Sequence, residues 1–213
     1  MGKLEFATLW VTENKKAFPN FEALKELGAL KTFEKIPSIN SFLYEFYSMG
    51  AVRHGDYIAK VRVIPTEQTK NAITEKNIDL DSAEWPYRKG IIKEIAQKNL
   101  TFELQIQLCK DLKEMPVNDL TKEWSQELSP FRTVAKITIP KQTVPEDGNF
   151  EIMENLSFTP FRTIEENSPI GNLQRSRQSA YVTSSTSRHE LNHKKRKEPK
   201  NLEEAFSPEF YQL

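Results

Sequence analysis

The chain has 213 residues, of which 30 are basic and 30 acidic, so its formal net charge is zero. No overall electrostatic field therefore favours nucleic acid or an anionic membrane surface as a partner. A hydrophobic content of 38% supports one modest core, and no apolar run approaches the roughly twenty residues of a membrane-spanning helix. The single cysteine, Cys109, excludes an intramolecular disulfide and favours a reducing, cytoplasmic compartment.

The first predicted element is a helix over residues 4–35, because apolar residues recur there at helical spacing. Residues 57–64, 101–109 and 131–139 instead alternate apolar and polar side chains, which predicts three strands. Between the first two strands, residues 66–90 are polar and show no clear period.

The alternation is clearest in the segment LTFELQIQLC. One face of this strand carries apolar side chains, and the other carries Glu103, Gln105 and Gln107. We expect the polar face to meet water, as in an antiparallel sheet or barrel. The apolar face consists of Phe102, Leu104, Ile106 and Leu108.

The last predicted elements are a helix from about Asn172 to residue 193 and a polar tail over residues 194–213. The order of elements predicts an α+β fold: a helix, long antiparallel strands, then a helix. We expect residues 1–193 to form one unit.

A possible zinc site lies near the end of the last helix, where His189, Glu190 and His193 form H-E-x-x-H. On a helix, this spacing can hold a zinc ion and activate its water. However, residues 184–187 before the motif are all serine or threonine, which favour caps and turns over a buried helix. We therefore favour a polar helix end over a zinc protease. A third ligand would have to come from the tail, at Glu203, Glu204 or Glu209.

Four segments in order resemble the catalase family, above all its short, divergent members. They are FYSMGAVRHGDYIAKVRVIP (46–65), MPVNDLTKEWSQELSPFRTVAKITIPKQ (115–142), ENLSFTP (154–160) and SPIGNLQRSRQSAYVTSSTSRH (168–189). The last segment ends in the family's Arg-rich helix, with Arg175, Arg177 and Tyr181, followed by the pair Arg188-His189. The resemblance covers most of residues 40–193 and implies part of a catalase-type antiparallel β-barrel with flanking helices.

The resemblance also implies a haem site, with Tyr181 as the proximal ligand of the iron. Arg177 and Tyr181 are four residues apart, so on a helix they share one face. A guanidinium one turn away stabilises the negative charge of a phenolate ligand. Arg175 is a candidate partner for a haem propionate. An ordinary amphipathic helix with a packed tyrosine is the alternative interpretation.

The family's distal histidine and asparagine, which handle the protons of peroxide, precede the region that the resemblance covers. The resemblance therefore implies a haem protein related to breakdown of hydrogen peroxide or organic hydroperoxides in oxidative stress. We expect the isolated chain to be incomplete or degenerate, and inactive. We also expect it to form a homo-oligomer or to pair with a missing N-terminal half. The alternative is a non-catalytic binding or scaffold protein built on a catalase-like fold.

Overall fold

The computed structural model describes residues 37–82, 84–144, 155–195 and 199–205. The helix predicted over residues 4–35 and much of the predicted tail lie outside these ranges. The extent of the unit predicted over residues 1–193 stays a prediction.

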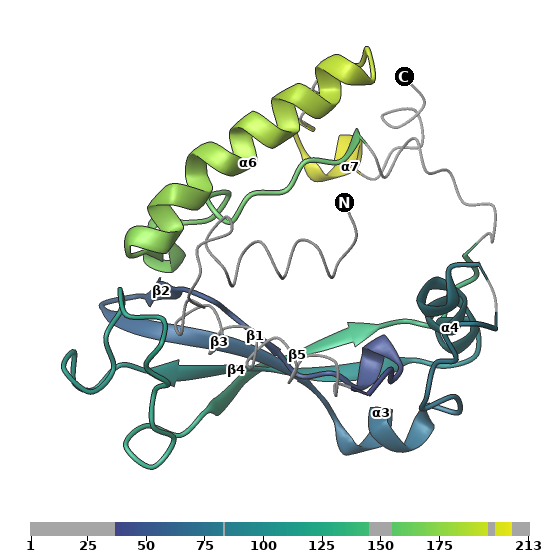
Figure 1. Ribbon diagram of the computed structural model, residues 1–213, viewed down its shortest axis with the longest axis horizontal. Coiled ribbons are helices and arrows are strands. Elements are labelled where there is room, and N and C mark those ends of the chain that lie inside the picture. The colour runs from purple at the N-terminus through teal and green to yellow at the C-terminus, as the bar shows by residue number, and fades with distance from the viewer. Residues whose placement is uncertain (1–36, 83, 145–154, 196–198, 206–213) are drawn as a thin grey trace, which may run out of the picture.

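The fold is built on one antiparallel sheet of six strands (Figure 1). Along the sheet the order is β5-β4-β3-β2-β6, and β1 pairs with β3 beyond the end of β2. The three strands expected from alternation are present as β3, β4 and β5. The strands are β1 Phe46–Tyr47, β2 Ala51–His54, β3 Tyr57–Pro65, β4 Leu100–Leu108, β5 Arg132–Ile139 and β6 Pro169–Ile170.

The sheet is open within the part of the chain that the structure describes. It ends at β5 on one side and at β6 on the other, and these two strands do not pair with each other. The antiparallel strands and the flanking helices agree with the sequence-based prediction, whereas the barrel is not shown.

Helix α3 Glu67–Ala72 lies in the region that showed no clear period, and α4 Pro86–Ile95 begins in it. Thr66 begins α3, because its hydroxyl oxygen accepts a hydrogen bond from the Thr69 backbone N–H at 3.2 Å. Pro86 begins α4, where its fixed φ suits the first helical position. Both helices are short, which explains why their periodicity is hard to recognise.

The longest helix among the described residues, α6 Asn172–Leu191, starts where the sequence predicted it. Figure 1 shows it running above the sheet, while α3 and α4 lie at the far end of the sheet. Although α6 is 20 residues long, it is too polar to cross a membrane, and no other helix among the described residues is long enough. Two 3-10 turns, η1 Ser41–Leu43 and η2 Glu165–Asn167, and a short helix, α7 Leu202–Ala205, complete the elements of the described ranges.

Strand β4 is covered on opposite faces at its two ends. At its start, Leu100 and Phe102 pack with Ile73 and Ile95 from the α3 and α4 region. Near its end, the opposite face is buried, because Gln105 and Gln107 are only 7% and 2% exposed. The prediction that both glutamines meet water is therefore wrong.

The segment between β4 and β5 explains the burial of Gln107. It folds back over the sheet and places Trp124 beside Lys60, whose Nζ lies 4.7 Å from the ring centroid. The side-chain amide of Gln107 donates to the carbonyl oxygens of Trp124 and Ser129 at 3.0 and 2.8 Å. A buried polar group that keeps its hydrogen bonds costs little, so alternation alone could not reveal which face was covered.

The fully buried Glu94 of α4 joins this helix to the turn after α3. Its Oε1 accepts from the backbone N–H groups of Thr74 and Glu75, each at 3.1 Å. Its Oε2 lies 2.9 Å from Lys98 Nζ. Burial alone would raise the pKa of Glu94, but hydrogen bonds from Lys98, the Glu75 backbone and the Thr74 side chain together hold that pKa below its usual range.

We predict that Glu94→Gln destabilises the fold by about 3–5 kcal/mol, because it leaves the mostly buried Lys98 without its counter-charge. The contribution of Glu94 is present above the pKa of an unfolded glutamate, about 4.3, and is lost as the pH falls through the lower folded-state value. The difference between wild type and variant in urea unfolding should therefore shrink below about pH 4. Glu67→Gln, which breaks the exposed Glu67–Lys70 pair, is the control and should change stability by less than about 0.5 kcal/mol. Equal effects of the two variants would contradict this role.

Candidate functional site

The start of α6 is held by a glycine and an asparagine. Gly171 has a φ of +95°, and a Cβ at this position would lie 2.8 Å from Val117 Cγ1. The side-chain oxygen of Asn118 accepts from the backbone N–H of Asn172 at 2.8 Å. The loop that carries Val117 and Asn118 therefore fixes the direction in which α6 extends from the end of β6.

A series of hydrogen bonds runs from the sheet to Tyr181. The buried Gln174 donates from Nε2 to the carbonyl oxygen of Ala51 in β2 at 3.3 Å. Its Oε1 accepts from Arg177 Nη1 at 3.0 Å. Arg177 Nη2 donates in turn to the hydroxyl oxygen of Tyr181 at 2.7 Å. The sheet thus orients the tyrosine through two intervening side chains.

Gly50 makes this arrangement possible. A Cβ on Gly50 would lie 2.8 Å from Gln174 Nε2 and 2.9 Å from its Cδ. Only a residue without a side chain lets the amide approach β2 closely enough to reach the Ala51 carbonyl.

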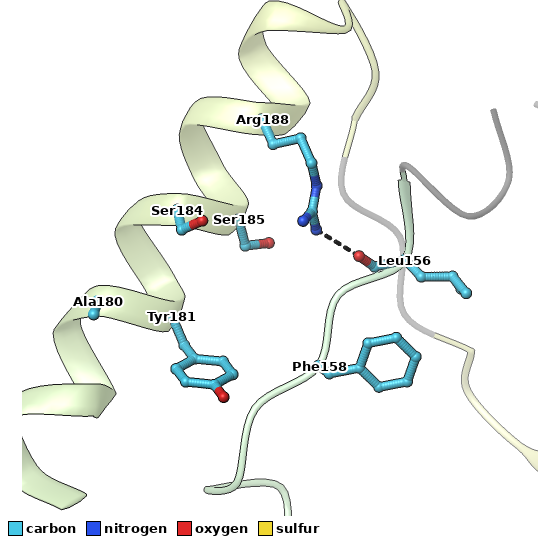
Figure 2. Close-up of a pocket in the computed structure, with 7 residues that line it drawn as sticks. All are labelled: Leu156, Phe158, Ala180, Tyr181, Ser184, Ser185 and Arg188. Carbon is cyan, nitrogen blue, oxygen red and sulfur yellow. Dashed lines mark hydrogen bonds between the residues drawn. The ribbon is translucent and has the colours of Figure 1, made fainter. Parts of the chain in front are cut away.

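Tyr181 lines a pocket of about 380 Å³ between α6 and residues 155–158, which we call the strap. Figure 2 shows Tyr181, Ser184, Ser185 and Arg188 on the helix side and Leu156 and Phe158 on the strap side. Phe158 is 73% exposed, so the strap wall is apolar and open to solvent. Arg188 Nη2 donates to the carbonyl oxygen of Leu156, whereas its buried Nε has no hydrogen-bond partner among the described residues.

The two arginines of the predicted site lie differently. Arg177 contacts Tyr181, with its guanidinium 5.2 Å from the ring centroid, which agrees with the face that their spacing predicted. The guanidinium of Arg175 instead binds the side-chain oxygen of Asn172 and is exposed, and Arg175 does not line the pocket.

The geometry of the two histidines does not favour the zinc interpretation, and Glu209, one of the candidate third ligands, lies outside the described residues. Helix α6 ends at Leu191, and His193 has a φ of +53°, so the pair does not sit on one helical face. Both ring nitrogens of His189 lie against backbone carbonyl oxygens. No group of three metal-capable side chains occurs in the ranges that the structure describes.

Ser184, Ser185 and Arg188 were not recognised as site residues from the sequence. The signal was available, because they follow Tyr181 at three, four and seven residues and so continue its helical face. The strap residues had no such signal, since only tertiary structure brings Leu156 and Phe158 to α6.

We predict that Gln174→Leu destabilises the protein by about 1–3 kcal/mol, because it removes two hydrogen bonds from a buried site and leaves their partners unmatched. Gln178→Leu is the matched control, on the same helix but exposed, and should cost no more than about 0.5 kcal/mol. Urea unfolding of both variants measures the difference. Equal stability of Gln174→Leu and Gln178→Leu would show that the hydrogen bond from Gln174 to the sheet does not stabilise the protein.

Comparison with known proteins adds evidence at the level of the fold. No protein-family model and no curated protein match the chain. Among solved structures, it is similar to catalase A from Saccharomyces cerevisiae, with a TM-score of 0.57 and 21% identity over 90% of this chain and 44% of that one. It is also similar to a fungal catalase, with a TM-score of 0.55 and 22% identity over 71% of this chain and 32% of that one. The chain therefore has a catalase-like fold and spans less than half the length of the catalases it matches.

Proposed function

We propose that the chain binds haem beside α6, with the phenolate oxygen of Tyr181 as the proximal ligand of the iron. We further propose a role in breakdown of hydrogen peroxide or an organic hydroperoxide, in defence against oxidative stress. The observation that carries the proposal is the 2.7 Å hydrogen bond from Arg177 Nη2 to the hydroxyl of Tyr181, a residue that lines a pocket of about 380 Å³.

The residues present fit this cofactor. Tyrosine is a known haem ligand, and the pocket volume lies within the range of small-molecule sites, about 300–1,000 Å³. The strap side offers Leu156 and Phe158 as apolar contacts. The unpartnered Nε of Arg188 is a buried cationic donor, which suits an acidic group of the ligand.

The proposed roles follow from these positions. Arg177 places a positive charge beside the Tyr181 oxygen and stabilises a phenolate there. Gln174 holds Arg177 in place, and Arg188 is better located than Arg175 for a propionate. Bound haem would supply the redox chemistry of peroxide cleavage.

None of the chain's three histidines lines the pocket. His54 is exposed at the end of β2, His193 lies beyond α6, and His189 binds two backbone carbonyls. Proton transfer to peroxide needs a positioned acid or base. We therefore propose that this chain alone binds haem but turns over peroxide slowly. A cytoplasmic location stays a prediction.

We predict that purified protein titrated with ferric haem shows a shifted Soret band, which Tyr181→Phe removes. Arg177→Leu should weaken haem affinity about 10–100-fold, as expected for a group that supports a metal ligand. Tyr57→Phe is the control, since Tyr57 is 63% exposed on β3, and it should bind like wild type.

An unchanged Soret band in Tyr181→Phe would contradict the ligand assignment. Oxygen release from hydrogen peroxide tests the second part of the proposal, and we expect only slow release from the haem-loaded chain. Rapid release would show that the chain has its own proton-transfer group.

We also propose that β5 pairs with a strand of another polypeptide, such as a second copy of this chain. Val134 and Ile137 on this last strand are 48% and 39% exposed. An exposed edge strand with apolar side chains readily pairs with another strand.

Val134→Lys should shift the protein toward the monomer in sedimentation velocity, because a charge on an edge strand opposes pairing. Leu112→Lys, in an exposed loop position, should leave the distribution unchanged. A wild-type chain that is monomeric at every concentration would rule out self-association through β5.

A further inference from the structure

One face of the central strands β3 and β4 is apolar. Antiparallel partners carry their side chains on the same face of a sheet, and the register pairs Leu104 with Val63 and Ile106 with Val61. The same face continues to Phe46 in β1, which is paired with Val63, and to β5 on the other side. We call this set the apolar face: Phe46, Val61, Val63, Leu104, Ile106 and Ile137.

The exposure of the apolar face increases from its centre to its margins. Val61, Leu104 and Ile106, in the two central strands, are half-buried. At the margins, Phe46 in β1 is 53% exposed and Ile137 in β5 is 39% exposed. Neighbouring strands lie about 4.8 Å apart, whereas a helix with its side chains is about 10–12 Å across. A single helix over the centre would therefore cover β3 and β4 and leave the strands on either side in contact with solvent.

The chain reaches the sheet beside one end of the apolar face. The carbonyl oxygen of Pro37 accepts from the Tyr44 hydroxyl at 2.8 Å. The ring of Phe42 packs against that of Phe102 in β4, with centroids 6.0 Å apart. Phe102 lies on the same side of β4 as the apolar face, because side chains two residues apart in a strand point the same way. Residues 1–36 are therefore joined to the sheet where the apolar face begins.

The sequence of this preceding segment matches the face in chemistry and in length. Phe21, Leu24 and Leu27 recur at helical spacing, with charged residues between them. On a helix these three side chains span about 120°, the width of an apolar stripe that packs on a core. A helix over residues 21–30 would be about 15 Å long, similar to about five residues of a strand. The six residues that follow can extend over about 20 Å, which is enough to reach the sheet.

We propose that residues 21–30 pack as a helix on the apolar face, with Leu24 and Leu27 against β3 and β4. These residues lie outside the described ranges. The partner of the face is thus a segment of the same chain. A tethered segment meets its site at an effective concentration on the order of millimolar, which favours it over a second copy of the chain. The inference concerns the sheet and does not depend on haem.

Methyl NOE spectra of the full chain test the contact directly. The methyl groups of Leu24 and Leu27 should show NOEs to those of Leu104 and Ile106. The methyl groups of Leu191, which is 80% exposed, are the control and should show no NOE to the sheet. If the wild-type chain gives no NOE between residues 21–30 and the apolar face, the proposal is overturned.

A mixed sample separates the two possible partners. Two batches of the chain with different isotope labels are combined, and NOEs between them are recorded selectively. We expect the contacts of Leu24 and Leu27 within one chain only. If the same NOEs arise between differently labelled chains, a second copy covers the face and the intramolecular contact is overturned.

Two neighbouring substitutions test the role of the apolar stripe. Leu27→Lys should remove the NOEs and increase binding of the dye ANS several-fold, because a charge on the stripe releases the segment from the apolar face. Glu26→Lys introduces the same side chain beside the stripe and should behave like wild type. The backbone NOEs that pair β3 with β4 show whether the sheet stays folded in both variants. If the sheet is folded and both variants bind the dye equally, Leu27 does not cover the face; if Leu27→Lys unfolds the sheet, the wild-type NOEs decide.

Discussion

The arrangement of the candidate site depends on a guanidinium held between a buried amide and a tyrosine hydroxyl. Arg177 donates to Gln174 on one side and to Tyr181 on the other, at 3.0 and 2.7 Å. Hydrogen bonds of a charged group contribute more than those between neutral groups, about 1.5–3 kcal/mol each. Since Gln174 is itself bound to the Ala51 carbonyl, the orientation of Tyr181 is fixed relative to the sheet and not by the helix alone.

The rest of the fold positions Gln174 and α6 so that the hydrogen bonds of Arg177 can form. Gly50 leaves room for the Gln174 amide, and Gly171 with Asn118 sets the direction of α6. In the sheet, β4 is covered at one end by α3 and α4 and at the other by the segment around Trp124. The strap then closes the opposite side of the pocket, bound to α6 at three successive residues. One side of the site is thus anchored in the sheet, and the other depends on contacts with a single helix.

The sequence predicted those parts of the fold that depend on local periodicity. Strands β3, β4 and β5, the start of α6 and the shared face of Arg177 and Tyr181 all follow from residue spacing. It failed where tertiary contacts decide the outcome. Gln105 and Gln107 look like a solvent-facing pair in the sequence, but sheet side chains bind the first and the later segment covers the second. Helices α3 and α4 are too short to show a period. H-E-x-x-H suggested a metal site because the pattern cannot show that α6 ends before His193 or that both ring nitrogens of His189 are already occupied.

The most direct measurement is a resonance Raman spectrum of the haem-loaded chain, recorded with unlabelled and with ring-deuterated tyrosine. If Tyr181 is the iron ligand, the spectrum contains phenolate vibrations that shift with the label and vanish in Tyr181→Phe but not in Tyr57→Phe. A haem spectrum without label-sensitive phenolate bands, or one that Tyr181→Phe leaves unchanged, would contradict the account.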